Sequence, residues 1–590
     1  MNELSSFYTA EIKKYEHQLA SVKKRLYASS MLRLAIFCIA IVAVYYVAPQ
    51  TKLILVVLLV TVALFLFLVT RHSNLQYQSD LLKSLININK TELKVLARNF
   101  HDLPEGNEFK DPTHYFSQDI DLFGRGSFYQ YVNRTALKQG SEVFARLLKS
   151  NDVAAIEKKQ EAVKELSQLP EWRQKFSAIA TLAKTTTHTE SIINWLENHK
   201  LFVPKVMKVL PYVFSVLSIG WFILYFMDFI PETVLIIWWV IGMGITGIYI
   251  KKIIFLAESA SKVQSVFQQY NKLLVLIEEE KFDSEILKSQ KLNITSEKFR
   301  VSEVTEHFSK LLYNLDKVGN MVYFIFGNGL FLRTISHCYQ IEEWIQKYGA
   351  YTEKWFQAIA FFDAYNSMGN FAFNHPSYTF PKIKTEGSVL NSINTGHPLL
   401  NPEQSVLNDF KIDNEQFFIV TGANMAGKST FLRTVSLEIV MANLGLPVCA
   451  KEVNYNPIKL ITSMRTTDSL TDDESYFFSE LKRLKFIVDE IQTNRYFIVL
   501  DEILKGTNST DKAKGSRKFV ERLVNSKSTG IIATHDLSLC EVADALPQVE
   551  NHYFDAEIID NELHFDYKFK EGVCQNMNAS FLLKKMEIVD

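Results

Sequence analysis

Cysteine is scarce in this sequence, and basic residues do not outnumber acidic ones. The 590 residues include five cysteines, and no two of them form a Cys-x-x-Cys pair. This scarcity argues against a disulfide scaffold and a cysteine-rich zinc site, and it fits a reducing compartment. The 64 Lys and Arg residues are balanced by 65 Asp and Glu residues, for a formal net charge of -1. The balance argues against a protein that is basic over its whole surface, but not against a local basic patch.

Long apolar runs are present, although the mean hydropathy of +0.00 conceals them. They occupy residues 34–48, 53–69, 209–227 and 234–250. A helix that crosses a bilayer core needs about 20 apolar residues, with roughly 17 as the lower limit. We therefore predict two transmembrane hairpins, one within residues 31–70 and one within residues 209–250. The alternative is that one or both pairs are buried core helices.

Charges flank the two predicted hairpins unevenly. Arg33 and Arg71 border the first hairpin, and lysines border both ends of the second, whereas Asp228 and Glu232 lie in the second turn. By the positive-inside rule, both termini and the middle segment are expected on the cytoplasmic side of an inner or plasma membrane. The spans contain almost no ionisable groups, which favours anchoring over transport.

The rest of the chain divides into helical segments and one α/β segment. We expect a cytoplasmic helix over 1–30, a helical core over 73–208, a second helical segment over 253–375 and an α/β domain over 385–590. Within the core, the helical pattern breaks near residues 150–152, where we expect the next helix to be capped. A further apolar stretch at 318–332 is too short for a span and is interpreted as core.

A phosphate-binding loop follows a predicted strand at residues 417–420. Residues 422–429 read GANMAGKS and match GxxxxGK[ST], and a helix is predicted from Thr430. In such a loop, backbone N–H groups and the helix N-terminus bind phosphates. Lys428 is expected to reach the β- and γ-phosphates, and Ser429 to ligate Mg²⁺. The predicted ATP-binding residues are Gly422, Ala423, Asn424, Met425, Ala426, Gly427, Lys428, Ser429 and Thr430.

Two further predicted strands end in residues suited to nucleotide hydrolysis. The strand at 496–500 ends in Asp501 and Glu502, and the strand at 530–534 ends at His535. Asp501 is expected to serve the magnesium ion, and Glu502 to polarise the attacking water. His535 is expected to sense or stabilise the γ-phosphate. We therefore predict a Mg²⁺-dependent ATPase with Glu502, His535 and Lys428 as catalytic residues; the alternative is that these polar residues end their strands by chance.

At these residues the sequence resembles the MutS mismatch-repair ATPases. The resemblance is carried by GANMAGKST, by LDEILKGTNSTD and by ATHDLSLC, and it covers residues 390–587. More weakly, residues 119–166 resemble the helical core of that family, and residues 358–381 resemble its helical lever. The resemblance implies an α/β P-loop NTPase domain of the ABC/MutS type, preceded by a mostly α-helical core and lever body into which the two predicted transmembrane hairpins are inserted.

The family also forms dimers in which a serine from one ATPase domain completes the site of the other. Ser475 stands in the matching place and is the candidate for this contact in trans, although the family's usual glycine is absent around it. The resemblance thus implies a homodimer through the ATPase domains. The alternative is that Ser475 only caps the helix that follows.

Several features depart from the family. The first 100 residues contain no Phe-x-Glu triplet, which the family inserts into mismatched DNA. The first predicted membrane hairpin stands where the family has its N-terminal mismatch-reading domain. The second predicted hairpin stands near the place where the family's DNA clamp would be expected. The chain also ends without the family's closing helix-turn-helix.

The sequence therefore predicts a membrane-anchored, MutS-like ATPase that binds DNA and acts in mismatch repair by resemblance. A first alternative is a membrane scaffold or remodelling ATPase that has lost mismatch recognition. A second alternative is an ABC-type transport ATPase. The cofactors implied are ATP and Mg²⁺, and the partners implied are DNA, the membrane and a second copy of the chain.

Overall fold

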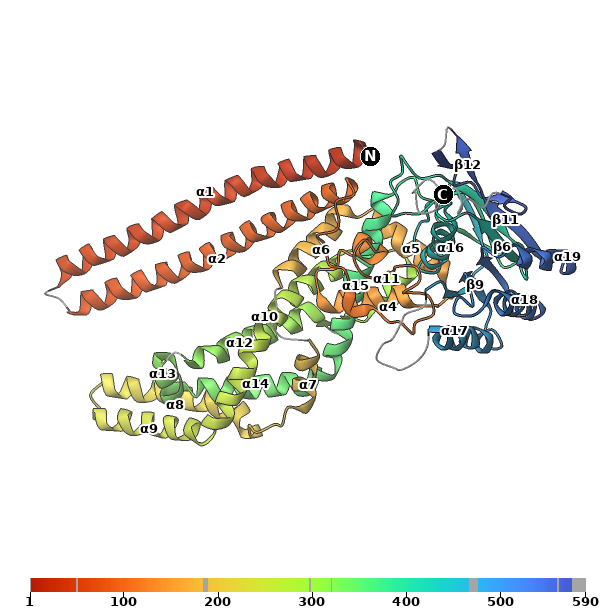
Figure 1. Ribbon diagram of the computed structural model, residues 1–590. Coiled ribbons are helices and arrows are strands. Elements are labelled where there is room, and N and C mark those ends of the chain that lie inside the picture. Colours follow the sequence, from red (N-terminus) through yellow and green to blue (C-terminus); the bar gives the residue numbers. More distant parts are fainter. Residues whose placement is uncertain are drawn as a thin grey trace.

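The computed structural model describes residues 2–48, 51–183, 189–296, 299–319, 321–465, 476–559 and 562–575. Figure 1 shows an elongated molecule with an α/β domain at one end and a helical body beside it. Two helical arms extend from the body, one drawn in red and orange and the other in yellow and green. Both arms point away from the α/β domain, so their tips lie at the same end of the molecule.

The first arm is a hairpin of α1 (Asn2–Val47) and α2 (Thr51–Leu96). Neither helix contains glycine or proline, so nothing in the sequence interrupts their backbone hydrogen bonds. The domain boundaries predicted at residues 30 and 70 therefore fall inside continuous helices. Each helix has 46 residues, which corresponds to roughly 69 Å of length.

The two halves of this arm differ in what surrounds them. Near the body, Tyr15 and Val22 of α1 and Leu85 of α2 belong to one buried cluster. Toward the turn, apolar side chains such as Phe37 and Ile41 are 57% and 56% exposed. The half of the arm nearer the turn therefore presents an apolar surface outward.

The second arm contains a helical hairpin with further helices packed along it. The hairpin consists of α8 (Leu210–Phe226) and α9 (Glu232–Ile248). The other helices of this region are α7 (Thr189–Asn198), α10 (Ile250–Glu279), α12 (Val301–Asp316), α13 (Met321–Phe331) and α14 (Arg333–Tyr348). Between α10 and α12 in the sequence, α11 (Glu285–Leu292) lies against the body (Figure 1). A two-stranded ribbon, β1 (Thr295–Ser296) with β2 (Phe299–Arg300), precedes α12.

Fewer helices qualify as membrane spans than the four that the sequence predicts. Among the described residues, Glu3–Val47 is long and apolar enough to cross a membrane. The bent pair Glu232–Ile248 and Ile250–Glu279, with 66° between its helices, would raise the number to two. Leu210–Phe226 is apolar but shorter, because its 17 residues correspond to only about 26 Å of helix. Soluble core helices and signal sequences can also meet this criterion of length and composition.

The sequence of residues 318–332 predicts a core segment, but this stretch does not lie in the core of the body. Its helical part, α13, packs against α8 and α9 instead, and the prediction was wrong for that reason. Met321 and Phe326 of α13 are 75% and 59% exposed. An apolar helix with exposed side chains gives the same sequence pattern as a core helix, so composition alone could not separate the two.

The helical body packs four short helices around a long one. The short helices are α3 (Phe128–Val132), α4 (Lys138–Lys149), α5 (Ile156–Ser167) and α6 (Pro170–Leu182), and the long one is α15 (Thr352–Asn374). The helix break predicted near 150–152 is confirmed, but the cap is not. α5 starts later, after Ala155, which has φ 52° and provides no side-chain cap.

Gly140 allows a close contact between α4 and α15. The carboxylate of Asp363 accepts hydrogen bonds from the backbone N–H groups of Ala136 and Leu137, at the start of α4. A Cβ on Gly140 would lie 2.0 Å from Oδ2 of Asp363. A glycine is therefore required at this position for the helices to pack as they do, and burial raises the pKa of Asp363 to about 7.

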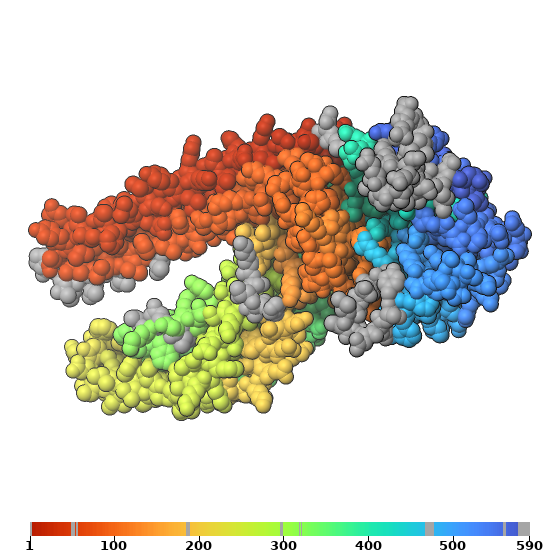
Figure 2. All heavy atoms as spheres, viewed as in Figure 1, coloured from red at the N-terminus to blue at the C-terminus, as the bar shows by residue number. Residues whose placement is uncertain are grey.

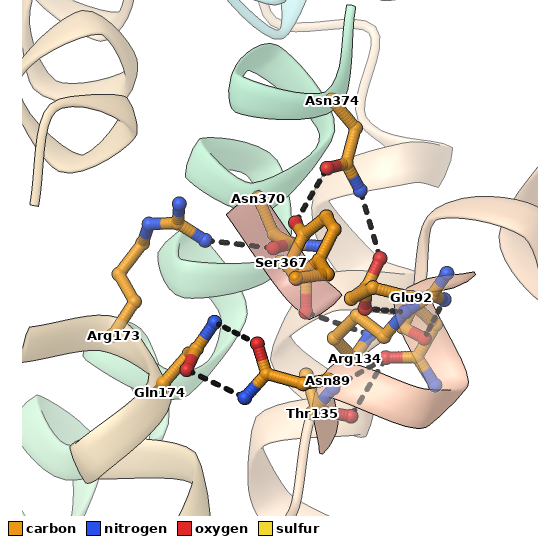
Figure 3. A network of polar contacts seen from close by, with 11 residues as sticks. Asn89, Glu92, Arg134, Thr135, Arg173, Gln174, Ser367, Asn370 and Asn374 are labelled. Atoms are coloured by element: carbon orange, nitrogen blue, oxygen red, sulfur yellow. Dashed lines mark hydrogen bonds and ion pairs between the residues drawn. The ribbon is translucent and has the colours of Figure 1, made fainter. Parts of the chain in front are cut away.

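A polar network joins the first arm to the end of α15 (Figure 3). Asn374 accepts a hydrogen bond from the Tyr8 hydroxyl at 2.6 Å and donates one to Glu92 at 2.8 Å. Glu92 also pairs with Arg134 at 2.6 Å. The contacts connect both helices of the arm to the last turn of α15, immediately before the chain enters the α/β domain.

The α/β domain contains a mostly parallel sheet in the order β14-β11-β6-β10-β9-β8. Its strands are β6 (Phe417–Gly422), β8 (Lys459–Ser463), β9 (Tyr496–Asp501), β10 (Thr529–Ala533), β11 (Val549–Phe554) and the antiparallel edge strand β14 (Lys570–Glu571). Its helices are α16 (Lys428–Asn443), α17 (Tyr476–Glu490), α18 (Ser509–Asn525) and α19 (Val542–Ala545). A second sheet orders β3 (Lys382–Ile383), β7 (Glu452–Tyr455), β4 (Leu390–Thr395) and β5 (Asn408–Ile412), and β12 (Ala556–Ile559) pairs with β13 (Glu562–Phe565). The strands at 417–420, 496–500 and 530–534 and the helix after the phosphate loop are confirmed.

The body contacts this domain through a short segment before α3. The carboxylate of Asp119 accepts hydrogen bonds from the hydroxyl of Thr462 at 2.5 Å and from the backbone N–H of Arg465 at 2.9 Å. Asp121 pairs with the Arg465 guanidinium at 2.6 Å. These contacts fix the α/β domain against the body independently of α15.

Candidate nucleotide-binding site

Three adjacent parallel strands bring the predicted catalytic residues to one edge of the sheet. β10 lies between β6 and β9, and Ala533 is in register with Val420 on one side and Asp501 on the other. The phosphate loop follows β6, Glu502 follows β9 and His535 follows β10. Ligands bind beyond the carboxyl ends of strands in open α/β sheets, and these residues meet at that edge.

The backbone of the phosphate loop turns its N–H groups inward. Met425 and Gly427 have φ 68° and 102°, and Gly427 directly precedes the first turn of α16. Left-handed residues alternating with right-handed ones create a concave group of N–H donors that suits an anion. The N-terminus of α16 adds its positive dipole end. The Met425 side chain is 76% exposed and lines the cavity beside the loop.

Lys428 lies folded into its own loop. The lysine is 6% exposed, and its Nζ donates hydrogen bonds to the carbonyls of Gly422 at 2.7 Å and Ala423 at 3.0 Å. Burial lowers the pKa of Lys428 from its ordinary value. A phosphate in the loop would provide the negative charge that these carbonyls supply only partially.

Ser429 and Asp501, the residues expected to bind magnesium, are in direct contact. The Ser429 hydroxyl donates a hydrogen bond to Oδ2 of Asp501 at 2.6 Å. Mg²⁺ prefers oxygen ligands and keeps several waters and phosphate oxygens, so it needs only one or two protein ligands. The pair fits such an ion, and among the described residues there is no cluster of three acidic, His or Cys side chains that would suit a different metal.

Glu502 and His535 are joined by a hydrogen bond at the mouth of the loop. Nε2 of His535 lies 2.8 Å from Oε1 of Glu502 and 3.3 Å from Nζ of Lys428. The hydrogen bond from His535 lowers the pKa of Glu502 to about 2, against the effect of partial burial. Glu502 is therefore an ionised carboxylate at neutral pH, as a residue that polarises water must be.

The backbone at Glu502 is held in an unusual conformation. Glu502 and Leu504 have φ 51° and 58°, which non-glycine residues adopt only when the surroundings hold them there. The buried carboxylate of Glu480, in α17, accepts hydrogen bonds from the backbone N–H groups of Leu504 and Lys505 at 2.5 and 3.1 Å. Glu480 thus anchors the loop that carries Glu502, a role that the sequence did not reveal.

A cavity of about 600 Å³ adjoins the loop. Its volume is in the range of small-molecule and cofactor sites. Ala423 to Thr430 line one side, together with Glu502 and His535, and the segment from Gly396 to Asn408 lines the other. Tyr567 closes the cavity, and its ring lies 3.1 Å from the position that a Cβ on Gly427 would take.

The cavity contains residues that the sequence analysis did not assign to the site. Leu400, Gln404, Val406 and Tyr567 lie within residues 390–587, for which the sequence showed only a resemblance to a family. Their residue types carry no phosphate chemistry, so only their place in the chain beside the loop could have indicated them. Ser475 lies outside the described residues, and its predicted contact in trans stays a prediction.

Comparisons with known proteins agree with this geometry. Residues 418–586 match the family model described as MutS domain V. Over 218 residues the chain is 32% identical to the "DNA mismatch repair protein MSH4" of Arabidopsis thaliana, covering 35% of this chain and 27% of that protein. It is 31% identical over 224 residues to the "DNA mismatch repair protein MutS" of Clostridium tetani, covering 36% and 25%.

A longer match at lower identity extends beyond the α/β domain. The chain is 26% identical over 286 residues to the "DNA mismatch repair protein MutS" of Fervidobacterium nodosum, covering 48% of this chain and 33% of that protein. The chain thus spans between a quarter and a third of the length of these curated relatives. The matches support a MutS-type, P-loop ATPase domain in the C-terminal part of the chain.

Proposed function

We propose that this protein is a Mg²⁺-dependent, MutS-like ATPase that is anchored in a membrane and couples ATP hydrolysis to DNA binding in mismatch repair. The observation that carries the proposal is the meeting of Lys428, Ser429, Asp501, Glu502 and His535 at one sheet edge, beside a cavity of about 600 Å³. The mismatch-repair role rests on the names of the relatives. Both termini and the ATPase domain are placed on the cytoplasmic side of an inner or plasma membrane by the charge pattern alone.

In this proposal the phosphate loop and Lys428 bind the triphosphate. Binding replaces the hydrogen bonds of Lys428 to Gly422 and Ala423 with stronger ones to phosphate oxygens. Mg²⁺, held by Ser429 and Asp501, would neutralise charge on the phosphate oxygens. Glu502 orients and polarises the attacking water once His535 turns from Glu502 toward the γ-phosphate. The Glu502–His535 pair therefore keeps the base engaged until nucleotide binds.

In this proposal, ATP hydrolysis moves the α/β domain, and α15 passes that movement to the arms. α15 ends at Asn374, eight residues before β3, and Asn374 contacts Tyr8 and Glu92 of the first arm. Gln160 of α5 donates a hydrogen bond to the Pro381 carbonyl at 2.8 Å and fixes the connecting segment against the body. A movement of the α/β domain would thus act on the same turn of α15 that holds the arm.

Membrane anchoring is supported by the reversed polarity of the second arm. Ser218 and Thr246 are 1% and 0% exposed, whereas Val216 and Phe226 are 69% and 79% exposed. Soluble helical bundles place apolar side chains inside and polar ones outside, and a helix pair in lipid can do the opposite. The apolar parts of both arms lie toward the same end of the molecule (Figure 1), so one membrane could receive both.

A second candidate function is a membrane scaffold or remodelling ATPase without mismatch recognition. The exposed apolar surfaces of both arms favour it, since the arms supply contact with lipid, whereas the net charge of -1 gives no separate support for DNA binding. Transport is the weakest candidate, because the expected spans carry almost no ionisable groups. The proposed homodimer through the ATPase domains is common to the first two candidates.

DNA should stimulate ATP hydrolysis by the detergent-solubilised full chain. The test compares homoduplex and mismatched duplex over a salt titration, because binding through phosphate contacts weakens steeply with salt. Stimulation by duplex DNA, greater with a mismatch, is the expected result. If neither duplex binds or stimulates hydrolysis while basal ATPase activity is intact, the repair function is wrong and the scaffold function replaces it.

A further inference from the structure

We propose that α13 is a third membrane-embedded helix of the second arm, buried among lipid acyl chains without crossing the bilayer. This inference rests on the membrane anchoring proposed above. The sequence of α13, MVYFIFGNGLF, has no charged residue. Lys317 precedes the helix and Arg333 follows it, so its charged neighbours flank the apolar segment on both sides.

α13 packs on the apolar hairpin through its glycines. A Cβ on Gly242 of α9 would lie 2.4 Å from the carbonyl oxygen of Gly329, and a Cβ on Gly329 would lie 2.1 Å from the ring of Trp239. Only glycine at both positions permits this approach of the two backbones. Close contacts between small residues hold helices together in lipid, where no hydrophobic force drives them together.

Three polar side chains of this three-helix cluster, Ser218, Trp238 and Trp239, form hydrogen bonds inside it. The Ser218 hydroxyl of α8 donates to the Leu330 carbonyl at 2.6 Å, and Trp238 Nε1 donates to the Ser218 oxygen at 2.7 Å. Trp239 Nε1 donates to the Ile325 carbonyl at 3.3 Å. Polar groups in lipid need such internal partners, because no water reaches them.

Asn328, a polar residue within α13, is satisfied in the same way. It is 1% exposed, donates to the Phe324 carbonyl at 2.8 Å and accepts a hydrogen bond from the backbone N–H of Thr334 at 2.9 Å. Outside the cluster, Met321 and Phe326 are 75% and 59% exposed. α13 therefore turns its polar groups inward and its apolar ones outward, as α8 and α9 do.

The occupant that fits this surface is the hydrocarbon of a bilayer. The surface continues that of α8 and α9, and Figure 2 shows the green atoms of this region against the yellow atoms of the hairpin at the far end of the arm. The 11 residues of α13 correspond to roughly 17 Å of helix, about half of the hydrocarbon thickness. This length is too short to cross the bilayer, so α13 would lie within one leaflet, and α14 connects it to α15 and the ATPase domain.

The test compares how lipid and water reach fluorescent labels on single cysteines. Labels are placed at Phe326→Cys and Met321→Cys of α13, at Val216→Cys of α8 and at Leu292→Cys of α11, whose native side chains are all exposed. Every variant carries Cys38→Ala, because Cys38 is an exposed native cysteine, and the Cys38→Ala protein corrects for labelling of Cys449. The labelled full chains are reconstituted in liposomes and quenched by aqueous iodide or by brominated lipid.

Both α13 labels should lose iodide quenching to the level of Val216→Cys and gain quenching by brominated lipid, while Leu292→Cys stays accessible to iodide. If both α13 labels behave as Leu292→Cys while Val216→Cys is quenched by lipid, the inference is wrong and the anchoring stands. If Val216→Cys also behaves as Leu292→Cys, the proposed anchoring fails, and the inference fails with it. Two α13 positions are labelled as a safeguard against misfolding of one variant. Altered elution in detergent reveals a folding defect, and the other variant then decides the test.

Discussion

Glu502→Gln should abolish ATP hydrolysis while ATP binding persists. The carboxylate lies next to the phosphate loop, and its pKa of about 2 keeps it ionised at neutral pH. A general base contributes about 10²- to 10⁴-fold to a reaction rate, and an amide cannot accept the proton. The rate of phosphate release under saturating ATP should therefore fall by about two to four orders of magnitude. Equilibrium binding of ATP should change little, because Glu502 does not belong to the phosphate loop.

The control for this variant is Glu521→Gln. Glu521 lies in α18 and pairs with Arg517 at 3.1 Å, away from the cavity. Its substitution removes the same charge and should leave hydrolysis unchanged. Turnover close to that of the wild type in Glu502→Gln would show that another group polarises the water, and the proposed role of Glu502 would then be abandoned.

Lys428→Ala should weaken ATP binding itself. The buried ammonium group of Lys428 donates hydrogen bonds to the carbonyls of Gly422 and Ala423, which carry no net charge. Phosphate oxygens are therefore its natural counter-charge. A hydrogen bond to a charged group contributes about 1.5–3 kcal/mol, which corresponds to roughly a tenfold to hundredfold or greater loss of affinity. Titration calorimetry with ATP and Mg²⁺ measures the loss directly.

Lys527→Ala is the matched control for this second variant. The Lys527 side chain is 77% exposed, and its Nζ lies 4.0 Å from Glu415 at the surface. An exposed ion pair contributes little, so ATP affinity should not change. Equal affinity of Lys428→Ala and the wild type would contradict the assignment of this loop as the triphosphate site.

The nucleotide site could be predicted from the sequence because its signals are local. The residues around Lys428 form a contiguous strand, loop and helix, and Asp501 and His535 each follow a short apolar strand. Parallel strands bring such residues to one edge of the sheet, so their meeting did not depend on distant details. The wall of the cavity at Tyr567 and the anchoring of the Glu502 loop by Glu480 depend on tertiary contacts that no local pattern encodes.

The arms show where sequence patterns are insufficient. Apolar runs located α8 and α9, but α13 gave the pattern of a core helix because a helix with exposed apolar side chains and a buried one have the same composition. Only the exposure of Phe326 and the internal hydrogen bonds of Asn328 separate these cases. The change from polar to apolar composition near residue 30 predicts a boundary, and α1 runs through it as one helix.

We propose that one chain combines an ATPase site with membrane-embedded arms. The measurement that tests it most directly is Mg²⁺-dependent ATP hydrolysis across the fractions of a flotation gradient, after the full chain is reconstituted in liposomes and washed with high salt. High salt screens the charges that hold peripheral proteins to lipid headgroups, so only embedded protein should float. We predict that the ATPase activity migrates with the lipid and is absent from the Glu502→Gln protein. Activity that stays in the lipid-free fractions would contradict the account.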